Sequence, residues 1–362
     1  MDLTNTMDNN IIFTRYLYLK EEVRYALVTS ILLRERDKAL FWGFELFHSG
    51  FEDEVFDLLW KMYYDFYATL NPTLEKYMAR KYFDPAIKRD LALASIIINM
   101  SSKPCTTDVF MMRLNPKREP DYNIKWLEMR DYTKLANYIM HVDLSCRTNI
   151  INNVLEHFGE TKWKKMRNTF VTKSVDMRLV FLSHIMQICT LSTRKMIPRI
   201  NRLNLSVSPV TVEPFMPITS DRVRPDKLLK EVCKYSINCS QMLGAFELAR
   251  HACEIDMDTC YRKDWLFHGS FSPYWSDNIS KHGGVVDVEN RKIIFEEVTK
   301  EEMFIDACWL DPDEQSLETQ RKSTVCIDKI DNGVLAFYKA FSTFNITNMC
   351  ESELRALRQM KY

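Results

Sequence analysis

Residues 41–67 read FWGFELFHSGFEDEVFDLLWKMYYDFY. This stretch decides the fold, because it holds eleven of the chain's 44 Phe, Trp and Tyr residues (21, 7 and 16 in all). So much ring surface in so short a stretch has to be buried, either in the core of the chain or against a partner.

The spacing of the aromatic residues predicts two helices, one from Asp37 to about Phe47 and one from Glu52 to about Leu70. Gly50 separates them, since glycine takes the left-handed conformation that ends many helices. On the second helix the apolar side chains form two adjacent rows, so we expect it to be almost engulfed. The rows are Val55, Leu59, Met62 and Phe66, and Phe56, Trp60, Tyr63 and Tyr67.

The two helices form an expected αα-hairpin that nucleates the N-terminal lobe. Most of its rings then belong to the interior of a helical bundle. Only the rings nearest the turn, those of Trp42, Phe47 and Phe51, remain candidates for contact with a partner protein.

The composition of the whole chain favours helices. It has only eight glycines in 362 residues, below the usual ~7%, which disfavours turn-rich β architectures. Leu, Met, Lys, Glu and Arg are plentiful and prefer helices. One β-hairpin is predicted, from Gly283-Gly284 through VVDV and RKIIF. The expected fold class is therefore mainly α, a multi-helix bundle with a small β-hairpin in the C-terminal part.

Prolines, glycines and changes of composition along the chain predict four regions. These are a disordered tail over 1–12, a helical domain over 13–206, a proline-rich extended strap over 207–225 and a C-terminal α+β-hairpin domain over 226–362. Within the helical domain a short strand is expected at Val109–Leu114, between two prolines. Further helices are expected over 85–100, 124–191, 226–235, 241–253, 328–341 and 351–360.

No apolar window is long enough to predict a membrane span. The start, MDLTNTMDNN, lacks the basic and apolar segments of a signal peptide. We therefore expect the protein not to be secreted, and its ten cysteines to be reduced thiols in the cytoplasm or nucleus.

The motifs of common enzyme classes are missing from the sequence. It contains no phosphate-binding loop, no dinucleotide-binding turn, no G-x-S-x-G elbow and no H-E-x-x-H zinc helix. No catalytic residue, metal ligand or cofactor is predicted, and the protein is expected not to be an enzyme.

Carboxylates on Glu254, Asp256 and Asp258, or on Asp287 of the hairpin, nevertheless leave a metal-dependent nuclease or transferase open as a third hypothesis. Separately, a set of thiols and imidazoles has enough ligands for a zinc ion, with a plainer interpretation as buried core residues. The clusters are Glu254, Asp256, Asp258, Asp287 and Glu289, and Cys233, Cys239, His251, Cys253, Cys260 and His268.

The chain is neutral overall, but its charge is unevenly spread. Residues 162–202 hold ten basic residues and one acidic residue, a net charge of +9. Residues 296–318 hold nine acidic residues and one lysine, a net charge of −8. The basic stretch predicts either a nucleic-acid contact, with Trp163 stacking on a base, or a solvated face that pairs with the acidic stretch of the same or a neighbouring molecule. The candidate nucleic-acid contacts are Lys162, Trp163, Lys164, Lys165, Arg167, Arg194, Lys195, Arg199 and Arg202.

Two stretches carry a resemblance to known families. The segments RDKALFWGFELFHSGFEDEVFDLLWKMYYDF and FHGSFSPYWSDNISKHGGVVDVENRKIIF, with LDPDEQS further on, resemble conserved, uncharacterised proteins of large nucleocytoplasmic DNA viruses. The first is also similar to the helical oligomerisation domain of clamp-loader-like replication ATPases, with an Ala-Leu-aromatic-Trp helix turning at a glycine. No ATPase module accompanies it here, so that second similarity implies only a helical hairpin.

The viral resemblance implies a setting in the replication factory of an infected cell, in the host cytoplasm or nucleus, or in the virion. We therefore expect a non-enzymatic structural or scaffold protein that contacts other viral proteins or associates with itself. The alternative is a nucleic-acid-binding accessory factor of viral replication or transcription, acting through the basic stretch.

Overall fold

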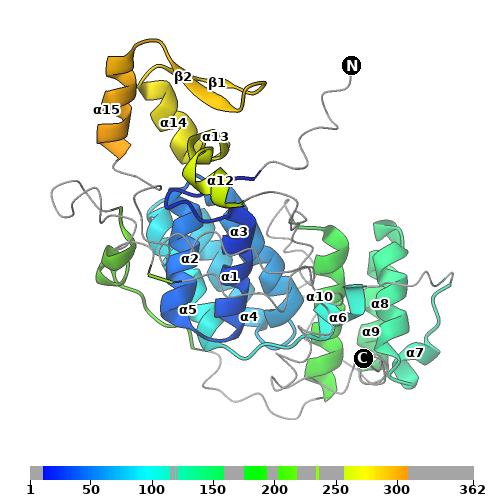
Figure 1. Ribbon diagram of the computed structural model, residues 1–362. Helices are drawn as coiled ribbons and strands as arrows, with labels where there is room; N and C mark the ends of the chain where they lie inside the picture. The colour runs from blue at the N-terminus through cyan, green and yellow to red at the C-terminus, as the bar shows by residue number, and fades with distance from the viewer. Residues whose placement is uncertain are drawn as a thin grey trace. The chain divides into compact units, whose positions relative to one another are not determined.

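The computed structural model describes residues 11–114, 119, 121–158, 175–193, 203–217, 234–235 and 257–308. Most of these residues are helical, and the described part of the chain contains one small sheet of two antiparallel strands (Figure 1). The mainly α fold class with a β-hairpin in the C-terminal part is therefore confirmed.

The chain divides into two compact units. Unit 1 comprises residues 1–55 and 208–337, and unit 2 comprises residues 56–207 and 338–362. This division differs from the expected order of domains, because the N-terminal helices cluster with the region after residue 207 instead of with the helices that follow them. One boundary coincides with the start of the expected strap.

Unit 1 begins with helices that the aromatic stretch predicts and ends with a small α+β part. Its elements are α1 (Lys20–Leu32), α2 (Arg36–His48), the start of α3 (Glu52–Met62), the 3₁₀ turns η6 (Pro209–Thr211) and η7 (Glu213–Phe215), α12 (Met257–Arg262), α13 (Trp265–Gly269), α14 (Pro273–Lys281), β1 (Gly284–Asp287), β2 (Lys292–Phe295) and α15 (Val298–Cys308).

The core of unit 1 lies between α1 and α2, which pack along their length. Trp42 on α2 is 2% exposed and meets Tyr18 edge-on, with ring centroids 5.1 Å apart. Phe44 stacks on Phe215 of η7 at 5.4 Å. Phe215 and the buried Val212 thus attach residues 208–217 to this core, although the segment expected to be extended forms two 3₁₀ turns and most of its residues are exposed.

The hairpin pairs Gly284 with Phe295 and Asp287 with Lys292. Its turn is stabilised by Asp287, whose carboxylate accepts bonds from the backbone N–H of Asn290 at 3.0 Å and from the Asn290 side chain at 2.7 Å. A short polar side chain that bonds to its own turn is a common way of closing such a loop.

The regular secondary structure among the described residues of unit 2 is helical. Its elements are the rest of α3, the π-helix η2 (Tyr63–Tyr67), α4 (Pro72–Phe83), α5 (Arg89–Ser102), α6 (Asp108–Leu114), α7 (Lys125–Glu128), α8 (Tyr132–His141), the 3₁₀ turn η3 (Leu144–Cys146), α9 (Arg147–His157) and α10 (Met177–Thr193). Helices α6, α8, α9 and α10 lie side by side in it (Figure 1).

The prediction of a strand at Val109–Leu114 is wrong, because this segment forms α6. The backbone N–H of Asp108 donates to the Thr106 hydroxyl at 3.3 Å, which caps the start of the helix. Val109, Phe110 and Met112 are then buried together, and tertiary packing against η2, α8 and α10 outweighs the β propensity of a valine.

Several expected elements lie outside the described residues, namely residues 1–10 of the tail, residues 226–233 of the helix over 226–235, and the helices over 241–253, 328–341 and 351–360. The described end of the tail is ordered: Ile11 is buried, and the Ile12 carbonyl accepts a hydrogen bond from Lys20 N at 3.0 Å.

Gly50 ends α2 in the left-handed region, with φ +89°, and a Cβ placed there would overlap the ring of Pro273 at the start of α14. We expect Gly50→Ala to destabilise the protein by about 2–4 kcal/mol in chemical denaturation. The strain of a positive φ in alanine and the clash of its Cβ with the Pro273 ring both contribute to this loss. Gly283→Ala is the matched control: its φ is +74°, but its nearest neighbour is the flexible Lys300 side chain. Equal losses for the two variants would contradict the role given to Pro273.

Candidate functional site

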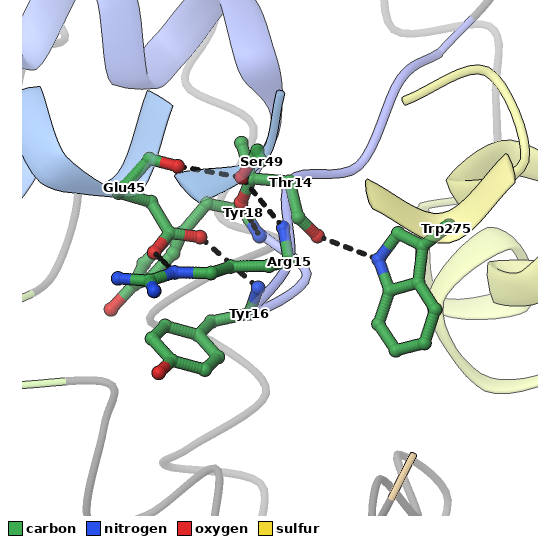
Figure 2. A network of polar contacts seen from close by, with 7 residues as sticks. All are labelled: Thr14, Arg15, Tyr16, Tyr18, Glu45, Ser49 and Trp275. Carbon is green, nitrogen blue, oxygen red and sulfur yellow. Dashed lines mark hydrogen bonds and ion pairs between the residues drawn. The ribbon is translucent and has the colours of Figure 1, made fainter. Parts of the chain in front are cut away.

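Among the described residues of unit 1, Arg15 and Glu45 form a buried ion pair (Figure 2). Arg15 Nε donates to Glu45 Oε2 at 3.0 Å, and the side chains are 6% and 0% exposed. The other carboxylate oxygen, Glu45 Oε1, accepts from the backbone N–H of Tyr16 at 3.0 Å. Both oxygens of this carboxylate are therefore engaged in holding the N-terminal segment to α2.

Ser49 completes this network at the end of α2 (Figure 2). Its hydroxyl accepts from Arg15 N at 2.9 Å and donates to the Glu45 carbonyl at 2.6 Å. A serine acting as a nucleophile needs a general base that takes its proton. Here the proton is held by a carbonyl oxygen, so the Arg15–Glu45–Ser49 network is structural.

His48 lies beside this network without joining it through a hydrogen bond. Its ring stacks on Phe44 at 5.7 Å and meets Phe47 edge-on at 5.2 Å. Burial, together with the smaller effect of the positive charge of Arg15, lowers the pKa of His48 to about 4. The imidazole is neutral at pH 7, and its pKa is too far from neutrality for efficient proton transfer.

This pKa makes stability depend on pH. The ordinary pKa is 6.5, so the unfolded chain takes up the proton first, and stability that is complete above pH 6.5 is lost as the pH falls towards 4. We expect a loss on the order of 1–2 kcal/mol, reduced by solvent screening of a partly exposed ring. Denaturation curves at pH 7 and pH 4.5 check this. His48→Gln should lose less stability than the native protein over the same range, and an equal loss would rule out His48 as the source.

Unit 2 has its polar core around the π-helix η2. Asp65 forms a bidentate pair with Arg113 of α6, with Nε–Oδ1 at 2.5 Å and Nη2–Oδ2 at 2.7 Å. On the other side the Tyr64 hydroxyl donates to Glu75 Oε1 at 2.8 Å, and His184 Nε2 lies 3.4 Å from Glu75 Oε2. Since π-turns are frequent at functional sites, this core is the first place to look for chemistry.

The geometry of this core argues for support of the fold. Asp65, Glu75 and Arg113 are all less than 10% exposed, and each carboxylate is bound to a neighbouring side chain. The wider π-turn directs consecutive side chains, Tyr64 and Asp65, to different helices. The π-helix thereby joins α4, α6 and α10 through charged and polar contacts.

The Asp65–Arg113 pair should behave as a buried ion pair. Arg113→Met strands the Asp65 carboxylate, and we expect it to cost about 3–5 kcal/mol in urea denaturation. Adding Asp65→Leu should restore most of that loss, because no charge is then left unpaired. The control is Lys300→Met in the exposed pair of Lys300 and Glu296, which should have little effect on the free energy of unfolding. Failure of the double variant to recover would show that the arginine acts mainly through other contacts.

His268 connects the β-hairpin to the N-terminal segment. Its Nδ1 lies 3.2 Å from the Ile11 carbonyl and donates to it, so Nε2 accepts from Arg291 Nη2 at 3.1 Å. Burial lowers the pKa of His268, and the Arg291 charge acts in the same direction. This histidine is a neutral structural link, and both of its ring nitrogens are occupied.

The residues predicted as partner contacts are mostly interior. Trp42 is 2% exposed and Phe51 is 5% exposed, so neither offers its ring to a partner, and that prediction is wrong for both. Phe47 keeps part of its surface. The fold explains the outcome, because the α2–α3 turn is itself covered: Ser49 O accepts from Tyr274 N at 3.2 Å.

The nine residues predicted to contact nucleic acid, Lys162 to Arg202, lie outside the described residues. Within the described part of the chain no three His, Cys, Asp or Glu side chains gather as a metal site would require. Asp287 closes the hairpin turn, and Cys260 and His268 are buried. Glu254, Asp256 and the remaining cysteines and histidine of the clusters are not among the described residues.

The exposed surface of the hairpin and α15 is unusually apolar. Val285 and Ile294 face each other across the two strands and are 64% and 47% exposed. The inner face is closed by Phe295, whose ring lies 5.3 Å from Phe304 of α15. We call the outer surface the hairpin–α15 face; its exposed apolar residues are Val285, Val288, Ile294, Val298, Met303 and Ile305.

On α15 the exposed apolar residues alternate with acidic ones. Phe304 points inward and is 1% exposed, so by helical geometry Val298, Glu302 and Ile305 share the opposite side. Residues 296–308 contain five acidic residues and one lysine. The sequence predicted this negative charge but not the exposed apolar residues beside it. Nothing in the sequence indicated that the apolar side chains of the hairpin and α15 lie outside the core.

No protein-family model matches the chain, and neither a curated protein nor a solved structure matches it. No helix in the described ranges is long and apolar enough to cross a membrane. The function is therefore argued from the chain's own residues.

Proposed function

We propose that this protein is a non-enzymatic scaffold of a large DNA virus, a virion component or a factory protein, that acts through protein–protein contacts at the hairpin–α15 face. The observation that carries the proposal is that the hairpin and α15, which pack against each other, expose several large apolar side chains, with Val285 and Ile294 as cross-strand neighbours. Val285, Val298 and Met303 are 64%, 72% and 63% exposed. Contiguous exposed apolar surface on a folded protein marks an interaction site, whereas single exposed residues do not.

The charge of the face specifies its partner. Glu296, Glu297, Glu301, Glu302 and Asp306 surround the apolar residues and are exposed. Acidic residues around an apolar centre favour a partner that presents basic residues around apolar anchors. Another viral protein of that kind, or the basic stretch over 162–202 of a second copy, fits this description.

The polar clusters of the described residues support a scaffold rather than an enzyme. Glu45, Asp65 and Glu75 are each buried and bound to a basic or hydroxyl side chain or a backbone N–H. A catalytic carboxylate has to face a space that substrate can enter. These carboxylates instead support the helices that surround them.

A photo-crosslinking amino acid at position 298 or 305 tests the proposal in infected cells. We expect cross-links to a defined protein, and far fewer from the same group placed at Asp37, an exposed residue of α2. Glu301→Lys with Glu302→Lys should reduce the yield from position 298 at least several-fold, since charge reversal opposes a basic partner. Equal cross-linking from positions 298 and 37 would sink the proposal.

The second candidate, nucleic-acid binding, is favoured by the net charge of +9 over residues 162–202. Retention on heparin or DNA that falls steeply with salt would support it. Changing Lys162, Lys164, Lys165 and Arg167 to Glu should then abolish retention, while Glu301→Lys with Glu302→Lys should not reduce it. Unchanged retention in the fourfold variant would remove this candidate.

A further inference from the structure

In unit 2 an extended segment of the chain is held by its backbone. Residues 203–207, here called the latch segment, lie against α4 and α5. Asn99 of α5 makes two hydrogen bonds to one residue of this segment: its Oδ1 accepts from Leu205 N at 2.8 Å, and its Nδ2 donates to Leu205 O at 3.1 Å. Lys103 Nζ donates to Leu203 O at 2.9 Å.

The side chains of the latch segment take little part in this contact. Leu203 is 74% exposed and Leu205 is 41% exposed, and residues 204 and 206 are exposed too. Apolar side chains normally anchor an extended segment in pockets. Here Leu203 is mostly exposed and Leu205 only partly covered while their peptide groups are bound, so α4 and α5 contact the segment chiefly through its main chain.

The receptor side of this contact is rigid and buried. Asn99 is 0% exposed, and its Nδ2 also lies 2.8 Å from the Ser95 carbonyl and 3.1 Å from the Tyr77 hydroxyl, so its two hydrogens are shared among these two acceptors and Leu205 O. These bonds fix the orientation of the carboxamide, with Oδ1 presented to Leu205. Lys103 is 4% exposed, and burial lowers the pKa of its ammonium group.

A carboxamide fixed in this way offers an incoming chain one acceptor and one donor, as a neighbouring β-strand does. Main-chain hydrogen bonds of this kind give affinity that depends little on sequence, and pockets for side chains add specificity. The α4–α5 surface makes such main-chain hydrogen bonds, but it does not enclose the side chains of Leu203 and Leu205 in pockets. Its ligand is therefore defined by conformation, an extended polypeptide.

We propose that the α4–α5 surface around Asn99 and Lys103 is a binding site for an extended polypeptide segment of another protein, and that the latch segment occupies it in cis. The tether gives the latch segment an effective concentration of about millimolar, so an outside segment binds when the latch segment is released. The site is separate from the hairpin–α15 face and does not depend on the function proposed for that face.

Leu205→Pro in the full chain tests this, because proline lacks the N–H that Asn99 accepts and leaves the receptor residues intact. The probe is a fluorescein-labelled synthetic peptide, RLNLSVS, which repeats residues 202–208. In fluorescence anisotropy we expect it to bind Leu205→Pro at least tenfold more tightly than the native protein. Adding Asn99→Ala to Leu205→Pro should abolish that binding.

Two control peptides separate backbone recognition from side-chain recognition. A peptide with both leucines replaced by alanine should bind within about threefold of the original, since their side chains are largely exposed. A peptide with an N-methylated residue at the Leu205 position keeps every side chain but lacks the donor, and it should not bind. Tighter binding of the N-methylated peptide than of the alanine peptide would overturn the proposal.

A folded Leu205→Pro variant that binds no peptide would also overturn the proposal, because the contact would then only stabilise the fold of this chain. Circular dichroism establishes folding. If Leu205→Pro does not fold, Asn204→Gly with Ser206→Gly provides the second variant, since it weakens the latch segment through chain entropy and keeps every bond. Its peptide affinity should exceed that of the native protein, and no increase would count against the proposal.

Discussion

The buried ion pair between Arg15 and Glu45 is the interaction on which unit 1 depends. Removing two charges from water is costly, and pairing them with further hydrogen bonds offsets that cost. Glu45 binds Arg15 Nε and Tyr16 N together. The carboxylate thereby forces the N-terminal segment into a turn against the end of α2.

Two hydrogen bonds link this network to α14. The Thr14 carbonyl accepts the indole N–H of Trp275 at 3.0 Å, and the Ser49 carbonyl accepts the backbone N–H of Tyr274 at 3.2 Å. Both donors belong to α14, which packs against β1 and α15. The polar network therefore holds in place the part of the chain that presents the hairpin–α15 face, although none of its own atoms belongs to that face.

Unit 2 is organised by the same rule with different residues. Asp65 and Glu75 are buried and paired across neighbouring helices, and Asn99 satisfies its carboxamide with the backbone of the latch segment. In both units the buried polar groups join elements that are distant in sequence. Their pairing favours one arrangement of these elements, and partner contacts are proposed only for the apolar surface left outside.

The sequence by itself determined the helical class, the helix–Gly50–helix turn, the β-hairpin and the uneven charge. These follow from local rules: side-chain period, the positive φ that glycine accepts, and turn residues between short apolar runs. The burial of the second aromatic helix also followed from its two adjacent rows of apolar side chains.

Only the tertiary structure decided which apolar residues are inside and which polar ones are paired. Trp42 and Val298 are both large and apolar, yet one is 2% exposed and the other 72%. The strand predicted at Val109–Leu114 became α6, and Asn99 met Leu205 across a long stretch of chain. Burial and pairing depend on contacts between distant segments, and local period and propensity carry no information about those contacts.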